Sequence, residues 1–206
     1  LTHIRHSEKV FIMKRLLLIL ILAFSFQTLS EADDIRDFEI EGMSVGDSLL
    51  EYFSEKEINK KINSKSTYRY TNNAYVSILI KSEKFKIYEE IGAVFKPNDN
   101  KFILQSIEGT FNYGSKVNEC YKKQNIITAD LKKTFSNTTE FKTYTREYTA
   151  DKTGKSTSKY NRFTFSNGSA ISVVCYDMDK DFIDPNDQLY LAISSEKFME
   201  WLDKNS

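Results

Sequence analysis

The residues best suited to chemistry are carboxylates, and their densest cluster lies near the C-terminus. Asp177, Asp179 and Asp181 alternate along the chain. Oxygen ligands at alternate positions are typical of Ca²⁺ loops, because a hard cation takes six or more oxygens. The loop template is broken at Phe182, where it needs glycine, and at Gln188, where it needs a bidentate glutamate. We therefore expect no metal and no other cofactor. The three aspartates are a weak calcium candidate, and a solvated acidic loop is the alternative.

A second group of carboxylates lies in segments with strand-like sequence. Glu90 and Glu108 would suit glycoside hydrolysis if they faced each other across one cleft, about 5–10 Å apart. Glu89 cannot pair with Glu90, because neighbouring residues of a strand point to opposite faces. One alternative function is therefore a carboxylate-only hydrolase of the cell envelope. The other interpretation is that these glutamates are surface charges on a half-exposed sheet.

Nucleophilic and zinc-dependent catalysis lack their usual residues. The only two histidines, His3 and His6, lie near the start of the sequence. Once that region is removed, no Ser-His-Asp triad, Cys-His pair or His-containing zinc site can form. The sequence contains no GxGxxG and no Walker loop, so no nucleotide-binding motif is present. We expect a protein without catalytic activity.

The first 32 residues have the three-part pattern of a secretory signal peptide. Lys14 and Arg15 precede an apolar run over 16–26, and Ser30 and Ala32 form a small-residue exit. The run is about half the roughly 20 residues that a membrane-spanning helix needs. We predict cleavage after Ala32, with an uncleaved anchor or a buried helix as the alternative.

This reading divides the chain into three parts: an upstream extension over 1–12, a signal peptide over 13–32 and a single mature domain over 33–206. The mature domain would be periplasmic or secreted, with no stable membrane span. It would carry 25 basic and 27 acidic residues, because the leader removes four basic and two acidic ones. A net charge of −2 gives no basic footprint, so we expect no nucleic-acid partner.

The two cysteines, Cys120 and Cys175, predict one disulfide. An even pair in an exported chain is typical of a disulfide bond. Cys120 falls on the apolar face of a predicted helix and Cys175 lies in a predicted strand. A helix packed on a sheet can bring two such residues together. The alternative is a pair of buried free thiols, which behave as small apolar residues.

The pattern of elements predicts an α+β fold, with antiparallel sheet packed by helices on one face, in the order β-α-βββ-α-ββββ-α. Capping boxes at 48–51 and 54–57 predict one helix to Asn63 or two short helices, with Leu50 and Ile58 in the core. Apolar residues at helical spacing predict a helix after Gly114, and Asn167-Gly168 predicts a type I′ hairpin turn. The predicted strands cover 35–40, 75–80, 85–95, 101–111, 141–149, 160–165, 169–176 and 189–193, before a C-terminal helix.

The 12 tyrosines and 15 phenylalanines allow two interpretations. They line an apolar groove for a ligand, or they simply fill the core of a sheet-rich domain. The expected partner is therefore an unknown envelope protein or a small apolar ligand.

Two segments carry a resemblance to a group of proteins. The run over 33–50, DDIRDFEIEGMSVGDSLL, and the run over 119–124, ECYKKQ, resemble uncharacterised exported proteins of AT-rich marine bacteria. The resemblance implies export and no particular activity. The sequence thus favours an exported, non-catalytic binding or interaction protein. Besides the hydrolase, a calcium-stabilised structural protein remains an alternative.

Overall fold

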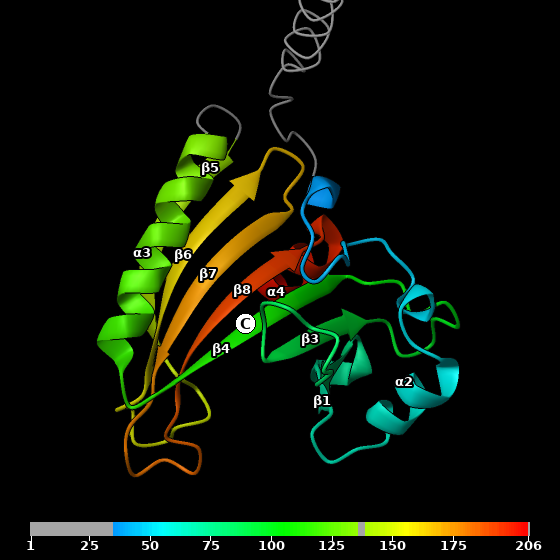
Figure 1. Ribbon diagram of the computed structural model, residues 1–206, viewed down its shortest axis with the longest axis horizontal. Coiled ribbons are helices and arrows are strands. Elements are labelled where there is room, and N and C mark those ends of the chain that lie inside the picture. The colour runs from blue at the N-terminus through cyan, green and yellow to red at the C-terminus, as the bar shows by residue number, and fades with distance from the viewer. Residues whose placement is uncertain (1–34, 136–138, 206) are drawn as a thin grey trace, which may run out of the picture. The chain divides into compact units, whose positions relative to one another are not determined.

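Eight strands form one antiparallel sheet in the order β1-β2-β3-β4-β8-β7-β6-β5 (Figure 1). The computed structural model describes residues 35–135 and 139–205, which belong to one compact unit. The predicted α+β class is confirmed. The predicted extension over 1–12 and signal peptide over 13–32 lie outside the described residues. The strands are β1 (Tyr68–Arg69), β2 (Val76–Ile80), β3 (Glu90–Phe95), β4 (Ser106–Gly114), β5 (Thr139–Glu147), β6 (Thr157–Phe165), β7 (Ala170–Asp177) and β8 (Asp187–Ser194).

Three α-helices and three short 3-10 turns complete the described part of the chain. They are α2 (Glu55–Ile62), α3 (Val117–Thr134), α4 (Glu196–Asn205), η1 (Ile35–Asp37), η2 (Leu49–Glu51) and η3 (Thr71–Asn73). Within the described ranges, none of the helices combines the length and the hydropathy required to cross a bilayer.

The sheet consists of two meanders, β1–β4 and β5–β8, which meet where β4 pairs with β8. In this pairing Glu108 lies opposite Ala192 and Thr110 lies opposite Tyr190. Side chains on a strand alternate between the two faces of the sheet. The register between β4 and β8 therefore decides which residues of the two meanders share a face.

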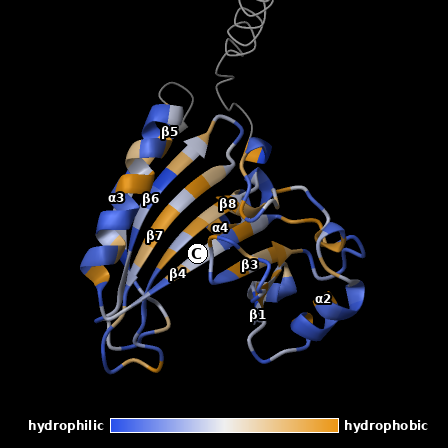
Figure 2. Cartoon of the chain, viewed as in Figure 1, coloured by the Kyte–Doolittle hydropathy of each residue, from blue (hydrophilic) through white to orange (hydrophobic). Residues whose placement is uncertain are grey.

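One face, which we call the covered face, carries the main hydrophobic core. Ile107, Phe163, Ile171 and Ile193 are buried there by the N-terminal segment and α3. Helix α3 contacts β4, β7 and β8. Figure 2 shows α2 as largely hydrophilic and β7 as largely hydrophobic, as expected for a helix at the surface and for a strand inside the sheet.

The other face, which we call the open face, is covered only in part, by α4. Phe198 packs edge-on against Tyr75, and both belong to a small cluster with Val94. The prediction that all helices lie on one face is therefore wrong for α4. Val94 alternates with buried residues of the covered face and would be exposed without the helix.

The predicted strand over 35–40 is a 3-10 turn followed by a single bridge between Ile40 and Met43. The Ser44 hydroxyl donates hydrogen bonds to the carbonyls of Arg36 and Phe38. The Ser44 side chain thus gives these carbonyls a local hydrogen-bond donor, and they need no neighbouring strand. Sequence periodicity does not reveal such a side-chain bond.

Both predicted capping boxes form, and of the two alternatives the pair of short helices is correct. Ser48 caps η2 and Ser54 caps α2. Leu50, predicted for the core, is 41 % exposed, while Leu49 is fully buried. The break between η2 and α2 changes which residues of η2 point toward the sheet.

Two further elements differ from expectation in their ends or turns. The strand predicted from 85 starts at Glu90, because the backbone N–H groups of residues 86–88 donate to the Glu41 carboxylate. The hairpin between β6 and β7 forms, but only Gly168 has a positive φ there, 89°. A type I′ turn requires two such residues, so the predicted turn type is wrong.

The predicted disulfide between Cys120 and Cys175 is confirmed, with the two Cα atoms 6.0 Å apart. It joins α3 to β7 on the covered face, beside Val173 and Leu189. Both cysteines are fully buried. The bond therefore fastens α3 to the middle of the sheet.

We expect removal of this bond to destabilise the protein substantially. The double variant Cys120→Ala/Cys175→Ala should lose about 4 kcal/mol of unfolding free energy, because the bond closes a loop of 55 residues in the unfolded chain. Urea unfolding measures the loss. Reductant should destabilise the wild type and leave the double variant unchanged. A loss below about 1 kcal/mol would contradict the assigned role.

Candidate functional site

The open face holds a groove of about 620 Å³. Its floor is formed by β4, β6, β7 and β8, and one wall is formed by α4. Tyr68 and Tyr70 of the β1 region close one side. A groove of this size is within the range of small-molecule binding sites, about 300–1,000 Å³.

One row of residues crosses the floor from end to end. Arg162 lies opposite Ser172, Ser172 opposite Ala192, and Ala192 opposite Glu108. The two residues in the middle are small, so they leave a trench between the long side chains at the ends. Three strand spacings separate the backbones of Arg162 and Glu108, which amounts to about 14 Å.

Glu108 finds room because its neighbour in the row is a glycine. Gly92 of β3 lies opposite Glu108, and a Cβ at Gly92 would be 3.0 Å from the Glu108 Oε2 atom. Any side chain at position 92 would therefore push the carboxyl group aside. This contact places the carboxyl group against the bare backbone of β3.

The Glu108 carboxyl group has no hydrogen bond or ion pair with any other residue of the described chain. Burial among the surrounding side chains raises its pKa. Burial, and then the charge of Glu108, raises the pKa of Tyr70 and Tyr190 as well. A half-buried acid without a partner is unfavourable for stability and is typical of functional sites.

Tyrosines and α4 form the two sides of the trench. Tyr176 packs edge-on against Tyr190, with ring centroids 4.9 Å apart. On the opposite side, Trp201 packs edge-on against Tyr70, at 5.6 Å. These rings offer flat apolar faces next to hydroxyl groups, which suits a ligand with apolar and polar parts.

Two guanidinium groups lie at the far end from Glu108. Arg146 lies over the ring of Tyr144 at 5.0 Å, and Arg162 lies over the same ring at 5.6 Å. The Arg162 Nη1 atom is 4.0 Å from Asp203, too far for a hydrogen bond. The buried Nε atom of Arg162 has no acceptor within the described part of the chain. This end of the groove therefore has donors for an anionic group.

The predicted hydrolase pair is only partly brought together. Glu90 and Glu108 lie on the same face of neighbouring strands, since their opposite residues are Thr110 and Gly92. Only Glu108 lines the groove, however. Glu90 forms an ion pair with Lys81 at 3.3 Å. The two carboxyl groups therefore do not share one cleft.

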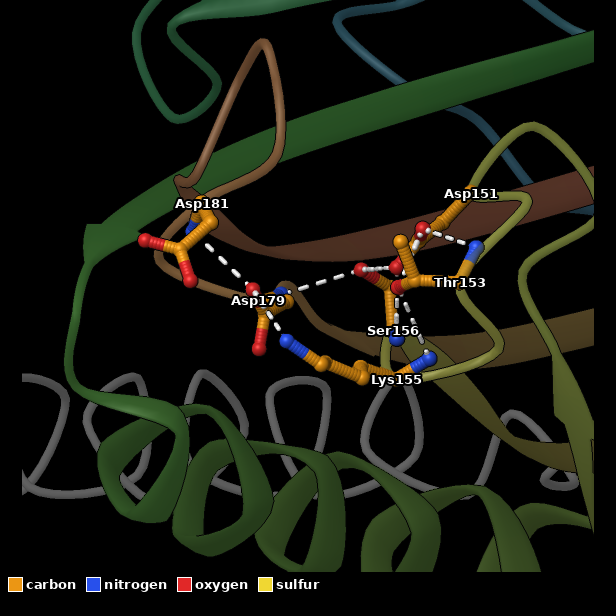
Figure 3. A network of polar contacts seen from close by, with 6 residues as sticks. All are labelled: Asp151, Thr153, Lys155, Ser156, Asp179 and Asp181. Atoms are coloured by element: carbon orange, nitrogen blue, oxygen red, sulfur yellow. Dashed lines mark hydrogen bonds and ion pairs between the residues drawn. The ribbon is translucent and has the colours of Figure 1, made fainter.

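Two of the three calcium candidates, Asp179 and Asp181, belong to a loop network that ties two hairpins together (Figure 3). The Asp179 N–H donates to the Ser156 hydroxyl at 3.0 Å, and that hydroxyl donates to Asp151. Hydrogen bonds from Ser156 and Thr153 hold the pKa of Asp151 well below its usual value. This network links the β5–β6 loop to the β7–β8 loop.

The three aspartates themselves have separate surroundings. Asp177 accepts from the Tyr121 hydroxyl at 3.5 Å, while Asp179 lies 4.0 Å from the Lys155 ammonium and accepts from the Asp181 N–H. Within residues 35–135 and 139–205, no three acidic, cysteine or histidine side chains are placed to share a metal ion.

Sequence reasoning named Glu108 but missed the arginines and Trp201. The missed signal is a period of two: Tyr160 and Arg162 alternate with buried Phe163, as Val174 and Tyr176 alternate with Cys175. Comparison with family models, curated proteins and solved structures finds no match to this chain. The function is therefore argued from the geometry.

We expect Glu108→Gln to stabilise the protein at neutral and alkaline pH. A carboxyl group with a raised folded pKa favours the folded state at low pH, and this contribution is lost as the pH rises from about 4.3 through the folded value. The variant should match the wild type near pH 4 and exceed it at pH 8 by about 1–3 kcal/mol. Chemical unfolding at both pH values measures the difference.

Glu90→Gln is the matched control, because Glu90 has a cationic partner on the same face. It should give no stabilisation that grows with pH. Equal stability of Glu108→Gln and the wild type at both pH values would show that Glu108 is well solvated.

Proposed function

We propose that this protein is an exported, non-catalytic binding protein that holds a small organic ligand in the open-face groove. The observation that carries this proposal is the partnerless carboxyl group of Glu108 on the groove floor. Folding alone would favour an apolar residue or an ion pair at such a place. A binding site, in contrast, needs polar groups that remain free for the ligand.

The distribution of aromatic residues supports a binding role. Phenylalanines such as Phe95 and Phe163 are fully buried on the covered face, whereas the tyrosines of β6–β8 line the groove. Tyrosine suits a surface that a ligand covers in the bound state and water covers in the free state, because it has an apolar ring and a polar hydroxyl. This favours a ligand with polar groups over the purely apolar ligand expected from the sequence.

Binding is favoured over catalysis by the surroundings of the second carboxylate. A carboxylate-only hydrolase needs two acids beside one bond. Lys81 neutralises Glu90 outside the groove, so Glu108 lacks an acidic partner there. The hydrolase remains the second candidate, on the observation that both glutamates lie on one face of the sheet.

Export is supported by the disulfide, since such bonds persist in oxidising compartments. We predict that the protein from fractionated native cells begins at Asp33 and is two hydrogens lighter than its reduced form. Intact-mass analysis before and after reduction measures both properties. A chain that retains residues 1–32, or that has two free thiols, would contradict export with cleavage.

The groove is tested by ligand binding and by a variant whose side chain fills it. Trp201 is the only tryptophan of the sequence and lines the groove, so its fluorescence reports on the site selectively. We expect at least one member of a panel of amino acids, short peptides and sugars to change this fluorescence saturably. Ala192→Phe should abolish the change, because the ring would occupy the trench.

The control variant is Lys142→Phe, which adds the same ring to the same row, beyond Arg162 and outside the groove. It should bind as the wild type does, with circular dichroism confirming that both variants fold. If no solute gives a saturable change, or if Ala192→Phe binds as well as the wild type, the proposed site is wrong.

A further inference from the structure

The groove presents opposite charges at its two ends, and this restricts the ligand. Glu108 lies at one end of the crossing row, and Arg162 lies at the other. A plain sugar would bring hydroxyl groups to these ends but no opposite charge, and hydrogen bonds between opposite charges are the stronger ones. A ligand with a cation at one end and an anion at the other would satisfy both.

We infer that the groove binds a short peptide with free termini, its amino group at Glu108 and its carboxylate at Arg162. This inference rests on the proposed binding function and names the ligand class of the same site. It is argued below from the length of the trench, the chemistry of each end and the shape of the middle.

The length of the trench matches about four residues. The backbones that carry Arg162 and Glu108 are three strands apart, or about 14 Å. An extended peptide advances about 3.3–3.6 Å per residue. Four residues therefore bring the two termini to the two ends, while a dipeptide reaches only one of them. The groove volume of about 620 Å³ allows a ligand of this size.

The arginine end is suited to a carboxylate. A guanidinium group offers donors in a planar fork that matches the two oxygens of a carboxylate. The Arg162 guanidinium group lies over the Tyr144 ring, 5.6 Å from the ring centroid. The Arg162 Nε atom is buried without an acceptor, and its nearest carboxylate, that of Asp203, is 4.0 Å away from Nη1. A peptide carboxylate would supply the missing acceptor.

The glutamate end is suited to an ammonium group. A cation beside Glu108 favours the ionised carboxylate, which burial alone disfavours. Tyr70 and Tyr190, whose pKa values are raised by burial and by the charge of Glu108, line the same groove. A protonated amine bound there would pair with an ionised Glu108, so the two charges balance. Affinity for such a peptide should therefore rise with pH until Glu108 is already ionised in the free protein.

The middle of the trench is suited to a backbone flanked by side chains. Ser172 and Ala192 leave space above the floor. The ring of Tyr176 on one side and that of Trp201 on the other offer apolar surface to alternate side chains. The floor strands are fully paired, so they select a ligand by its ends and side chains rather than by extending the sheet.

The experiment uses Trp201 fluorescence with four forms of tetra-alanine: free at both ends, N-acetylated, C-amidated and blocked at both ends. The free form should bind, and each single block should weaken binding about tenfold or more, because it leaves one buried charge unpaired. Dialanine should bind more weakly than tetra-alanine. In the Glu108→Gln variant, N-acetylation of the peptide should no longer weaken binding, while C-amidation should still weaken it.

Arg162→Gln is the reciprocal variant. In this variant, C-amidation of the peptide should lose most of its effect on binding, while N-acetylation should still weaken binding. Equal binding of free and doubly blocked peptides would overturn the inference, as would an effect of Glu108→Gln on both blocks alike. If no peptide binds but another solute does so in a manner sensitive to Ala192→Phe, the peptide class is wrong and the binding function stands. If no solute binds at all, both fail.

Discussion

The pairing of β4 with β8 is the constraint on which the rest of the structure depends. It joins two meanders into one sheet, and the crossing row of the groove runs through this seam, with Glu108 on one side and Arg162 on the other. A slip of one residue would turn every side chain of one meander to the opposite face. Glu108 would then enter the hydrophobic core, and Ile107 would face the groove. The same hydrogen bonds that complete the sheet thus bring the two ends of the site together.

The two faces of the sheet differ in which aromatic residue they use. Phenylalanines such as Phe163 fill the covered face beneath the N-terminal segment and α3, and tyrosines such as Tyr176 and Tyr190 line the open face. A buried tyrosine needs a hydrogen-bond partner for its hydroxyl, whereas a groove supplies water or a ligand. The small cluster around Phe198 is the exception, because α4 covers that part of the open face. Phenylalanine thus occupies the buried surface, and tyrosine occupies the surface that meets water or a ligand.

Local signals in the sequence predicted the fold class, both capping boxes, α3 and the disulfide, because each depends on neighbouring residues or on a unique pair. The predicted strand at 35–40 failed where the Ser44 side chain satisfies the backbone. Glu108 was named from its residue type, but its role depends on the glycine at 92 and on the strand partner Ala192. The arginines and Trp201 were missed because a period of two assigns residues only to a face of the sheet, and the strand order that gathers them has no direct signal in a single sequence. Whether the protein is exported and what it binds stay predictions.

The position of the disulfide has a consequence for the order in which the chain folds. Ser106 and Ser194, which pair across the seam between β4 and β8, are 88 residues apart. The bond between Cys120 and Cys175 lies within this interval and bypasses 55 residues of it. Once it forms, the chain path between the two strands shrinks to about two fifths, which lowers the entropy lost on closing that loop. Oxidation thus lets the most distant strand pairing of the sheet form earlier in folding than it would in the reduced chain.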